Sequence, residues 1–184
     1  MMRVPAWYVL LLGAIGAFRV RELYVSRAHE RGLAGRRAAR ATYPLMVAAH
    51  AGLLTLPLLE VSGHPGRRPR WPWLAVLAAA TVLRIWSIHS LGPAWNVRAL
   101  VPPDLDPVET GPYRYIRHPN YVAVILEFAA VPMVAGARFS AAFLSALNAI
   151  VLVDRISAEE RLLNESAAYR EAFSKRARFV PGLF

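Results

Sequence analysis

The sequence of 184 residues contains no cysteine, and only 18% of its residues are charged. The absence of cysteine excludes disulfides, thiolate metal sites and thiol nucleophiles. The sequence also lacks a phosphate-binding glycine loop, the GxGxxG dinucleotide motif, the HExxH zinc motif and the GxSxG nucleophile motif. The five histidines show no metal-ligand spacing, so no metal site is expected. An ordinary soluble domain has roughly 25% charged residues, so the low charge content argues against one.

Hydrophobic residues make up 56% of the chain and are gathered into five runs. A membrane-spanning helix needs about 20 mostly apolar residues, and the first three runs approach or reach that length. The last two are shorter and meet at Gly136, Ala137 and Arg138, which predicts a tight helical hairpin that enters or crosses the bilayer. We therefore expect an all-α integral membrane protein with about five transmembrane helices. The runs cover residues 4–20, 43–61, 71–91, 121–137 and 139–153.

The net charge of +10 comes almost entirely from arginine, and its distribution predicts an orientation. The segment 19–40 holds seven arginines against two glutamates, which is typical of a cytoplasmic loop. This places the N-terminus and the segment 62–70 outside, although 62–70 also carries three arginines. The polar segment 92–120 and the tail after Asp154 then face the cytoplasm. Nucleic-acid binding is not expected, because the basic residues lie in loops between apolar runs.

The first polar cluster, residues 111–121, reads GPYRYIRHPNY and directly precedes an apolar helix. Pro119 suits the first turn of that helix, and His118 then occupies the capping position. Free N–H groups at such a helix start can receive a carboxylate, and neighbouring tyrosine rings favour a cation. The stretch therefore predicts a site for a ligand that has a carboxylate, a flat heterocycle and a cationic centre. The alternative is an interfacial aromatic and basic anchor that binds no ligand.

A second polar cluster follows the last apolar run and contains Arg155, Glu159 and Glu160. On a helix, Arg155 and Glu159 lie one turn apart and can pair. The simplest interpretation is a solvated amphipathic helix. Both clusters are expected on the same side of the membrane, however, which favours a site that they form together.

Glu127 lies deep within the fourth apolar run. A carboxylate inside a bilayer is costly and is a functional candidate for that reason. The alternative is a hydrogen bond to another span, for example to Arg84, although Arg84 could instead extend toward the membrane surface.

The ordered pair of motifs, RHPxY at residues 117–121 and RxxxEE at residues 155–160, resembles the isoprenylcysteine carboxyl methyltransferase (ICMT) family. The resemblance covers roughly residues 90–184 and includes Leu91, Gly92 and Trp95. It implies an integral membrane enzyme that takes S-adenosylmethionine from the cytosol and methylates an oxygen of a lipid-like substrate. One departure is Ala123, at a position where family members often have glycine.

The resemblance also implies roles for individual residues. Arg155 and Glu160 correspond to residues near the reacting centre, and Glu127 is added as a third catalytic candidate that could contact a hydroxyl of the substrate. We expect a single membrane methyltransferase domain over residues 1–184, with three spans in 1–91 and the cofactor-binding catalytic part in 92–184. The expected cofactor-binding residues are Tyr115, Arg117, His118, Pro119, Tyr121 and Glu159.

Within that family, the chain looks most similar to small bacterial proteins associated with type III polyketide synthases. This implies a lipophilic acceptor, either a polyketide-derived phenolic lipid or an alkylpyrone. It also implies the bacterial cytoplasmic membrane as the location and a polyketide synthase as a candidate partner. The alternatives are carboxyl methylation of an isoprenylcysteine-like substrate, a phospholipid N-methyltransferase and a non-enzymatic membrane scaffold. A membrane reductase that uses NADPH is disfavoured because the chain is too short for its spans.

Overall fold

The computed structural model describes residues 4–102 and 106–180. Most of this part of the chain is helical. Two strands of two residues each, β1 (Arg36–Arg37) and β2 (Leu100–Val101), pair antiparallel. Two short 3₁₀ helices, η1 (Gly92–Ala94) and η2 (Gly111–Arg114), flank β2 in the sequence. The α-helices are α1 (Ala6–Gly32), α2 (Tyr43–Val61), α3 (Trp71–Leu91), α4 (Pro119–Val134), α5 (Arg138–Leu163) and α6 (Ala167–Phe173).

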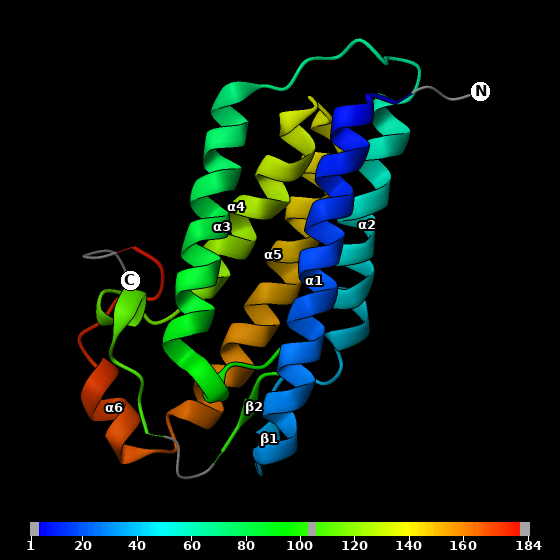
Figure 1. The fold of residues 1–184 in the computed structure, drawn as a ribbon. Helices are drawn as coiled ribbons and strands as arrows, with labels where there is room; N and C mark the ends of the chain where they lie inside the picture. Colours follow the sequence, from blue (N-terminus) through cyan, green and yellow to red (C-terminus); the bar gives the residue numbers. More distant parts are fainter. Residues whose placement is uncertain (1–3, 103–105, 181–184) are drawn as a thin grey trace.

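The five long helices lie side by side as a bundle, and the small sheet and α6 lie at one end of it (Figure 1). Helices α2, α5 and the continuous segment Trp71–Ala94 are long and apolar enough to cross a membrane. Helix α4 is also apolar but has only 16 residues. The predicted helical membrane architecture is confirmed at this level, whereas the number of five spans stays a prediction.

Helix α1 continues well beyond the predicted end of the first apolar run. It reaches Gly32, so much of the segment expected as a cytoplasmic loop is helical. The reason is that its polar side chains find partners within the protein. Glu22 is buried against Arg84 of α3, and the Ser26 hydroxyl accepts a hydrogen bond from the Val97 backbone N–H at 2.9 Å. Among the described helices, α1 does not qualify as a membrane span by composition, because it carries too many charged residues.

The predicted hairpin is present, with different helix bounds. Helix α4 begins at Pro119, the first-turn position expected for that proline, and ends at Val134. Gly136 makes the turn with a φ of 75°, which glycine adopts without steric cost. Helix α5 then runs ten residues past Val153, because its sequence contains no helix breaker before Leu163. Consequently Arg155, Glu159 and Glu160 lie on the same helix as the last apolar run.

The core of the bundle consists of closely packed apolar side chains around Phe128 and Leu144, which are almost fully buried. Interhelical contacts in lipid depend on close packing and hydrogen bonds rather than on exclusion of water. Gly52 of α2 allows such an approach, since a Cβ there would lie 3.1 Å from the Leu144 side chain of α5. The Tyr8 hydroxyl donates a hydrogen bond to the Val131 carbonyl at 3.0 Å and joins α1 to α4. This packing fixes the helix ends that build the site.

Candidate active site

A cavity of about 260 Å³ lies where α3 ends and α4 begins. Its volume is close to the lower end of the range of ~300–1,000 Å³ for small-molecule sites. Side chains from α1, α2, α3, α4, α5, α6 and the segment 94–101 line it. Helices from residues 1–91 therefore share the cavity with the predicted cofactor-binding part, residues 92–184.

The segment 94–101 is held over the cavity by hydrogen bonds to α1 and within itself. The Asn96 side chain accepts from the Leu100 N–H at 2.7 Å and donates to the Leu100 carbonyl at 3.0 Å, which closes the loop. The His29 ring lies 2.8 Å from the Trp95 carbonyl, so the end of α1 fixes this segment. Trp95 is buried as a result. The extension of α1 thus shapes one wall of the site.

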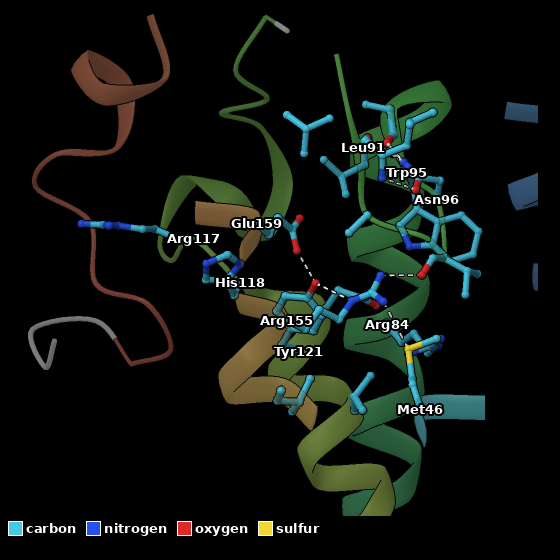
Figure 2. A pocket seen from close by; sticks show the side chains of 18 of the residues that line it. Met46, Arg84, Leu91, Trp95, Asn96, Arg117, His118, Tyr121, Arg155 and Glu159 are labelled. Carbon is cyan, nitrogen blue, oxygen red and sulfur yellow. Dashed lines mark hydrogen bonds between the residues drawn. The ribbon is translucent and has the colours of Figure 1, made fainter. Parts of the chain in front are cut away.

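Tyr121 links the two polar clusters at the centre of the cavity wall. Its hydroxyl donates a hydrogen bond to the Glu159 carboxylate and accepts one from Arg155 Nε at 2.9 Å, as Figure 2 shows. Arg155 and Glu159, which were expected to pair directly on one helix, are therefore joined through a residue of α4. The predicted meeting of the two clusters is confirmed by these contacts.

Arg155 is fixed from three directions. Besides Tyr121, its guanidinium donates to the Val97 carbonyl at 2.5 Å and to the Met46 sulfur at 3.3 Å. A guanidinium carries five N–H donors, so two remain for a ligand in the cavity. Arg155 is only 6% exposed, and a charge in such a setting interacts more strongly than it does in water. The arrangement presents a rigid, positively charged donor to the cavity.

Glu160 follows Glu159 on α5 but is not among the residues that line the cavity in the described part of the chain. Its carboxylate lies 3.0 Å from His118 Nε2 and 2.6 Å from Arg178 Nη2. It thus contacts His118 and Arg178. The hydrogen bonds and the negative charge of Glu160 raise the pKa of Arg178. Glu160 therefore holds His118 and the returning tail in place.

The chain after α6 runs back beside the RHPxY motif. The backbone N–H of Arg117 donates to the Ala177 carbonyl at 3.0 Å, and that of His118 donates to the Arg178 carbonyl at 3.1 Å. The Arg117 side chain donates to the Arg176 carbonyl at 2.7 Å. The sequence after α6 has no periodic pattern that would indicate contacts with the RHPxY motif. For this reason the contacts were not predicted.

The predicted cofactor-binding residues divide into two groups. Tyr115 is 56% exposed, and Pro119 is fully buried at the first turn of α4; neither lines the cavity. His118 occupies the N-cap position as expected, although its side chain makes no capping hydrogen bond. The four that do line the cavity are Arg117, His118, Tyr121 and Glu159.

Glu127 belongs to a buried cluster of two carboxylates and two guanidinium groups. Its carboxylate lies 2.6 Å from Arg19 and 3.6 Å from Arg84. The alternative interpretation of Glu127, a polar contact with another span, therefore has partners in the structure. Arg84 is buried and does not extend to the surface; two of its nitrogens donate to Glu22 at 2.6 and 2.9 Å. Arg19, Glu22 and Arg84 line the inner end of the cavity, whereas Glu127 lies behind them.

Several cavity residues were missed as site residues. Tyr113 of η2 and Tyr169 of α6 are buried aromatic residues that line the cavity and belong to one hydrophobic cluster. Burial, and secondly the charge of Glu159, raises the pKa of both phenols and so keeps both hydroxyls neutral. Tyr113 could have been found from its motif. Glu22 could not, because its i,i+3 neighbour Arg19 gives it the pattern of an ordinary exposed pair.

The cavity fits S-adenosylmethionine by the chemistry of its lining. The lining includes the cationic Arg117 and Arg155, either of which suits a carboxylate, and the Glu159 carboxylate suits hydroxyl or ammonium groups. Buried aromatic rings offer a face for a heterocycle or a sulfonium. The Asn120 side-chain oxygen at the cavity is buried and has no partner among the described residues. The same cavity has an apolar portion, lined by Met46, Val47 and Val124, that suits a lipophilic acceptor.

Comparison with known proteins agrees with a helical membrane fold. The model of the isoprenylcysteine carboxyl methyltransferase (ICMT) family matches residues 73–165. The chain is also 33% identical over 162 residues to a Bacillus subtilis (strain 168) protein described as the uncharacterized protein YpbQ; the match covers 85% of this chain and 96% of the relative. The chain belongs to the ICMT family, a family of membrane methyltransferases that use S-adenosylmethionine. The membership predicted from the two motifs is confirmed.

Proposed function

We propose that this protein is an O-methyltransferase that moves a methyl group from S-adenosylmethionine to a lipophilic acceptor at the membrane. The observation that carries the proposal is the chain of contacts Glu159–Tyr121–Arg155 in a partly apolar cavity. It combines a fixed cation for the acceptor oxygen with a carboxylate in one site. We further propose that all five long helices span the bilayer and that the cavity opens to the cytoplasm.

The chemistry requires close alignment more than strong acid or base groups. When bound, the donor supplies a methyl group on a sulfonium, whose carbon–sulfur bond breaks as the carbon–oxygen bond to the acceptor forms. Arg155 holds the acceptor oxygen and favours its anionic form, while Tyr121 and Val97 hold Arg155 in position. An acceptor that is already an anion has no proton to lose. For a neutral hydroxyl, Glu159 is the cavity carboxylate placed to take the proton, since Glu22 is committed to arginines.

For the acceptor, we propose a polyketide-derived phenolic lipid or an alkylpyrone, with a polyketide synthase as the partner that supplies it. Such molecules join one acidic oxygen to a long apolar chain, which matches a cavity that pairs Arg155 with an apolar wall. Carboxyl methylation of an isoprenylcysteine-like molecule would use the same Arg155 contact. A phospholipid amine acceptor is disfavoured, because the fixed guanidinium would repel an ammonium group.

Labelled methyl transfer tests this function directly. Membranes that contain the protein, incubated with methyl-labelled S-adenosylmethionine and an alkylpyrone or alkylresorcinol, are expected to yield a labelled methyl ether in the lipid fraction. Mass spectrometry of that fraction identifies the methylated atom. Label on a carboxyl ester or on an amine would contradict the proposed acceptor class, and binding of the cofactor without any transfer would contradict the enzyme assignment.

We propose that Glu160 is a positioning residue that acts through His118 and Arg178. Glu160→Ala removes charged hydrogen bonds worth ~1.5–3 kcal/mol each, so we expect the Kd of the cofactor to rise at least about tenfold. The rate at saturating cofactor should change little. Isothermal calorimetry and saturation kinetics separate the two effects, with exposed Glu171→Ala as the control. A fall in the saturated rate with an unchanged Kd would instead place Glu160 at the reacting centre.

A further inference from the structure

A second pocket lies at the opposite end of the bundle, where the segment between α2 and α3 meets the turn between α4 and α5. It is lined by Arg67, Arg68, Arg70, Ala135, Gly136 and Arg138. We call these six residues the basic pocket. Apart from Ala135 and Gly136, all of its residues are arginines.

The four arginines of the basic pocket are offset only in part, by Glu60, whose charge interacts with that of Arg67. Among residues 4–102 and 106–180, none of the four forms a salt bridge. Glu60 lies at the same end, but its carboxylate accepts hydrogen bonds from the Phe139 and Ser140 N–H groups at 3.0 and 2.7 Å and from the Ser140 hydroxyl. The basic pocket therefore carries an excess of positive charge that an anion would offset.

Backbone contacts hold this end of the bundle in a fixed shape. The Arg67 guanidinium donates to the Ala135 and Gly136 carbonyls at 3.0 and 3.3 Å, and the Arg70 N–H donates to the Val134 carbonyl at 2.9 Å. The Arg70 guanidinium packs directly on Gly136, where a Cβ would lie 2.8 Å from it. These contacts bring the arginines together instead of leaving them to spread on a loose loop.

The position of the basic pocket indicates the kind of anion. Helix α3 has 21 residues, so its two ends, Arg70 beside the basic pocket and Leu91 at the cavity, lie about 30 Å apart, close to the thickness of a bilayer's hydrocarbon core. Trp71 at the start of α3 is 72% exposed, and the Trp7 indole donates to the Arg67 carbonyl at 2.8 Å. Tryptophans gather at the head-group level of membranes. The pocket is therefore expected at the depth of lipid phosphates.

We propose that the basic pocket binds the phosphate of an anionic membrane phospholipid, in the leaflet opposite the one that the cavity faces. Arginine is suited to phosphate because its N–H groups match pairs of phosphate oxygens. The bound head group offsets the charge of the segment 62–70, whose three arginines would otherwise favour the cytoplasmic side of the membrane. It also ties the α4–α5 turn to the α2–α3 segment. This proposal does not depend on the methyl acceptor.

The test compares lipid binding by two variants that lose the same charge. In detergent, native mass spectrometry with phosphatidylglycerol should show bound lipid on the wild type and on Arg27→Gln/Arg31→Gln, which removes two exposed arginines at the other end. The Arg68→Gln/Arg138→Gln variant should bind about 30-fold more weakly, the scale expected for two arginines near a head group. All four replaced side chains are exposed. Binding of the cofactor checks that each variant is folded.

Three results would overturn the proposal. One is equal retention of phosphatidylglycerol by both variants, and another is equal loss in both, which would indicate unspecific charge attraction. The third comes from a competition arm: if inorganic phosphate displaces the lipid at similar concentration, the pocket is a site for free phosphate. Preference for phosphatidylglycerol over phosphatidylcholine, abolished only by Arg68→Gln/Arg138→Gln, supports the lipid site.

Discussion

Replacing Arg155 by lysine is expected to reduce the saturated rate of methyl transfer by about 100- to 1,000-fold, the loss typical for removal of one fixed donor to an oxyanion. Lysine keeps the charge but cannot contact Tyr121, Val97 and Met46 at once, because its ammonium is a compact point on a flexible stem. The acceptor oxygen would lose a donor held in a fixed direction. Methyl transfer to the acceptor, measured at saturating cofactor, reports this loss.

The control for this result is Arg161→Lys, on the same helix and exposed to solvent. Within the described part of the chain, its guanidinium donates to the Ser157 carbonyl one turn earlier and to no other residue. We expect its activity to match the wild type. The Kd of the cofactor should change less than the rate in Arg155→Lys. If the Kd rises and the saturated rate is kept, Arg155 binds the donor and does not hold the acceptor.

The sequence predicted the parts of the site that follow local rules. Pro119 at the first helical turn and His118 at the cap are local signals, and both were placed correctly. The apolar runs located α2, α3 and the hairpin because runs of that length have few alternatives to a membrane helix. The two polar clusters were expected to meet, and Tyr121 joins them.

The sequence did not predict contacts that depend on side chains from distant helices. Arg19 and Glu22 had the pattern of a loop beside the membrane, yet Glu22 is buried against Arg84, 62 residues away. Whether such a charge ends a helix or continues it depends on a partner that no local pattern reveals. The same holds for Glu160, whose neighbour Glu159 has the same chemistry but faces the cavity. One helical step of 100° separates the carboxylate in the site from the one behind it.

Glu22→Ala is expected to lower the free energy of unfolding by ~3–5 kcal/mol, the usual cost of leaving a buried charge without its partner. Glu22 accepts hydrogen bonds from Arg84 at 2.6 and 2.9 Å and from Arg19 at 2.7 Å. Without it, Arg84 and the half-buried Arg19 keep Glu127 as their one acidic partner among the residues that the structure describes. Unfolding in mixed micelles by titration with a denaturing detergent measures the change.

Two further variants show whether burial is the cause. Glu165→Ala removes an ion pair to Arg36 whose side chains are 58% and 65% exposed, and should cost no more than ~1 kcal/mol. The double variant Glu22→Leu/Arg84→Met removes charges of both signs and should recover much of the loss, since buried pairs are often replaceable by apolar residues. If Glu22→Ala costs no more than Glu165→Ala, water in the adjoining cavity solvates the guanidinium groups. The inner end of the cavity would then be wet, and the acceptor's apolar chain would have to lie along α2 and α4 instead.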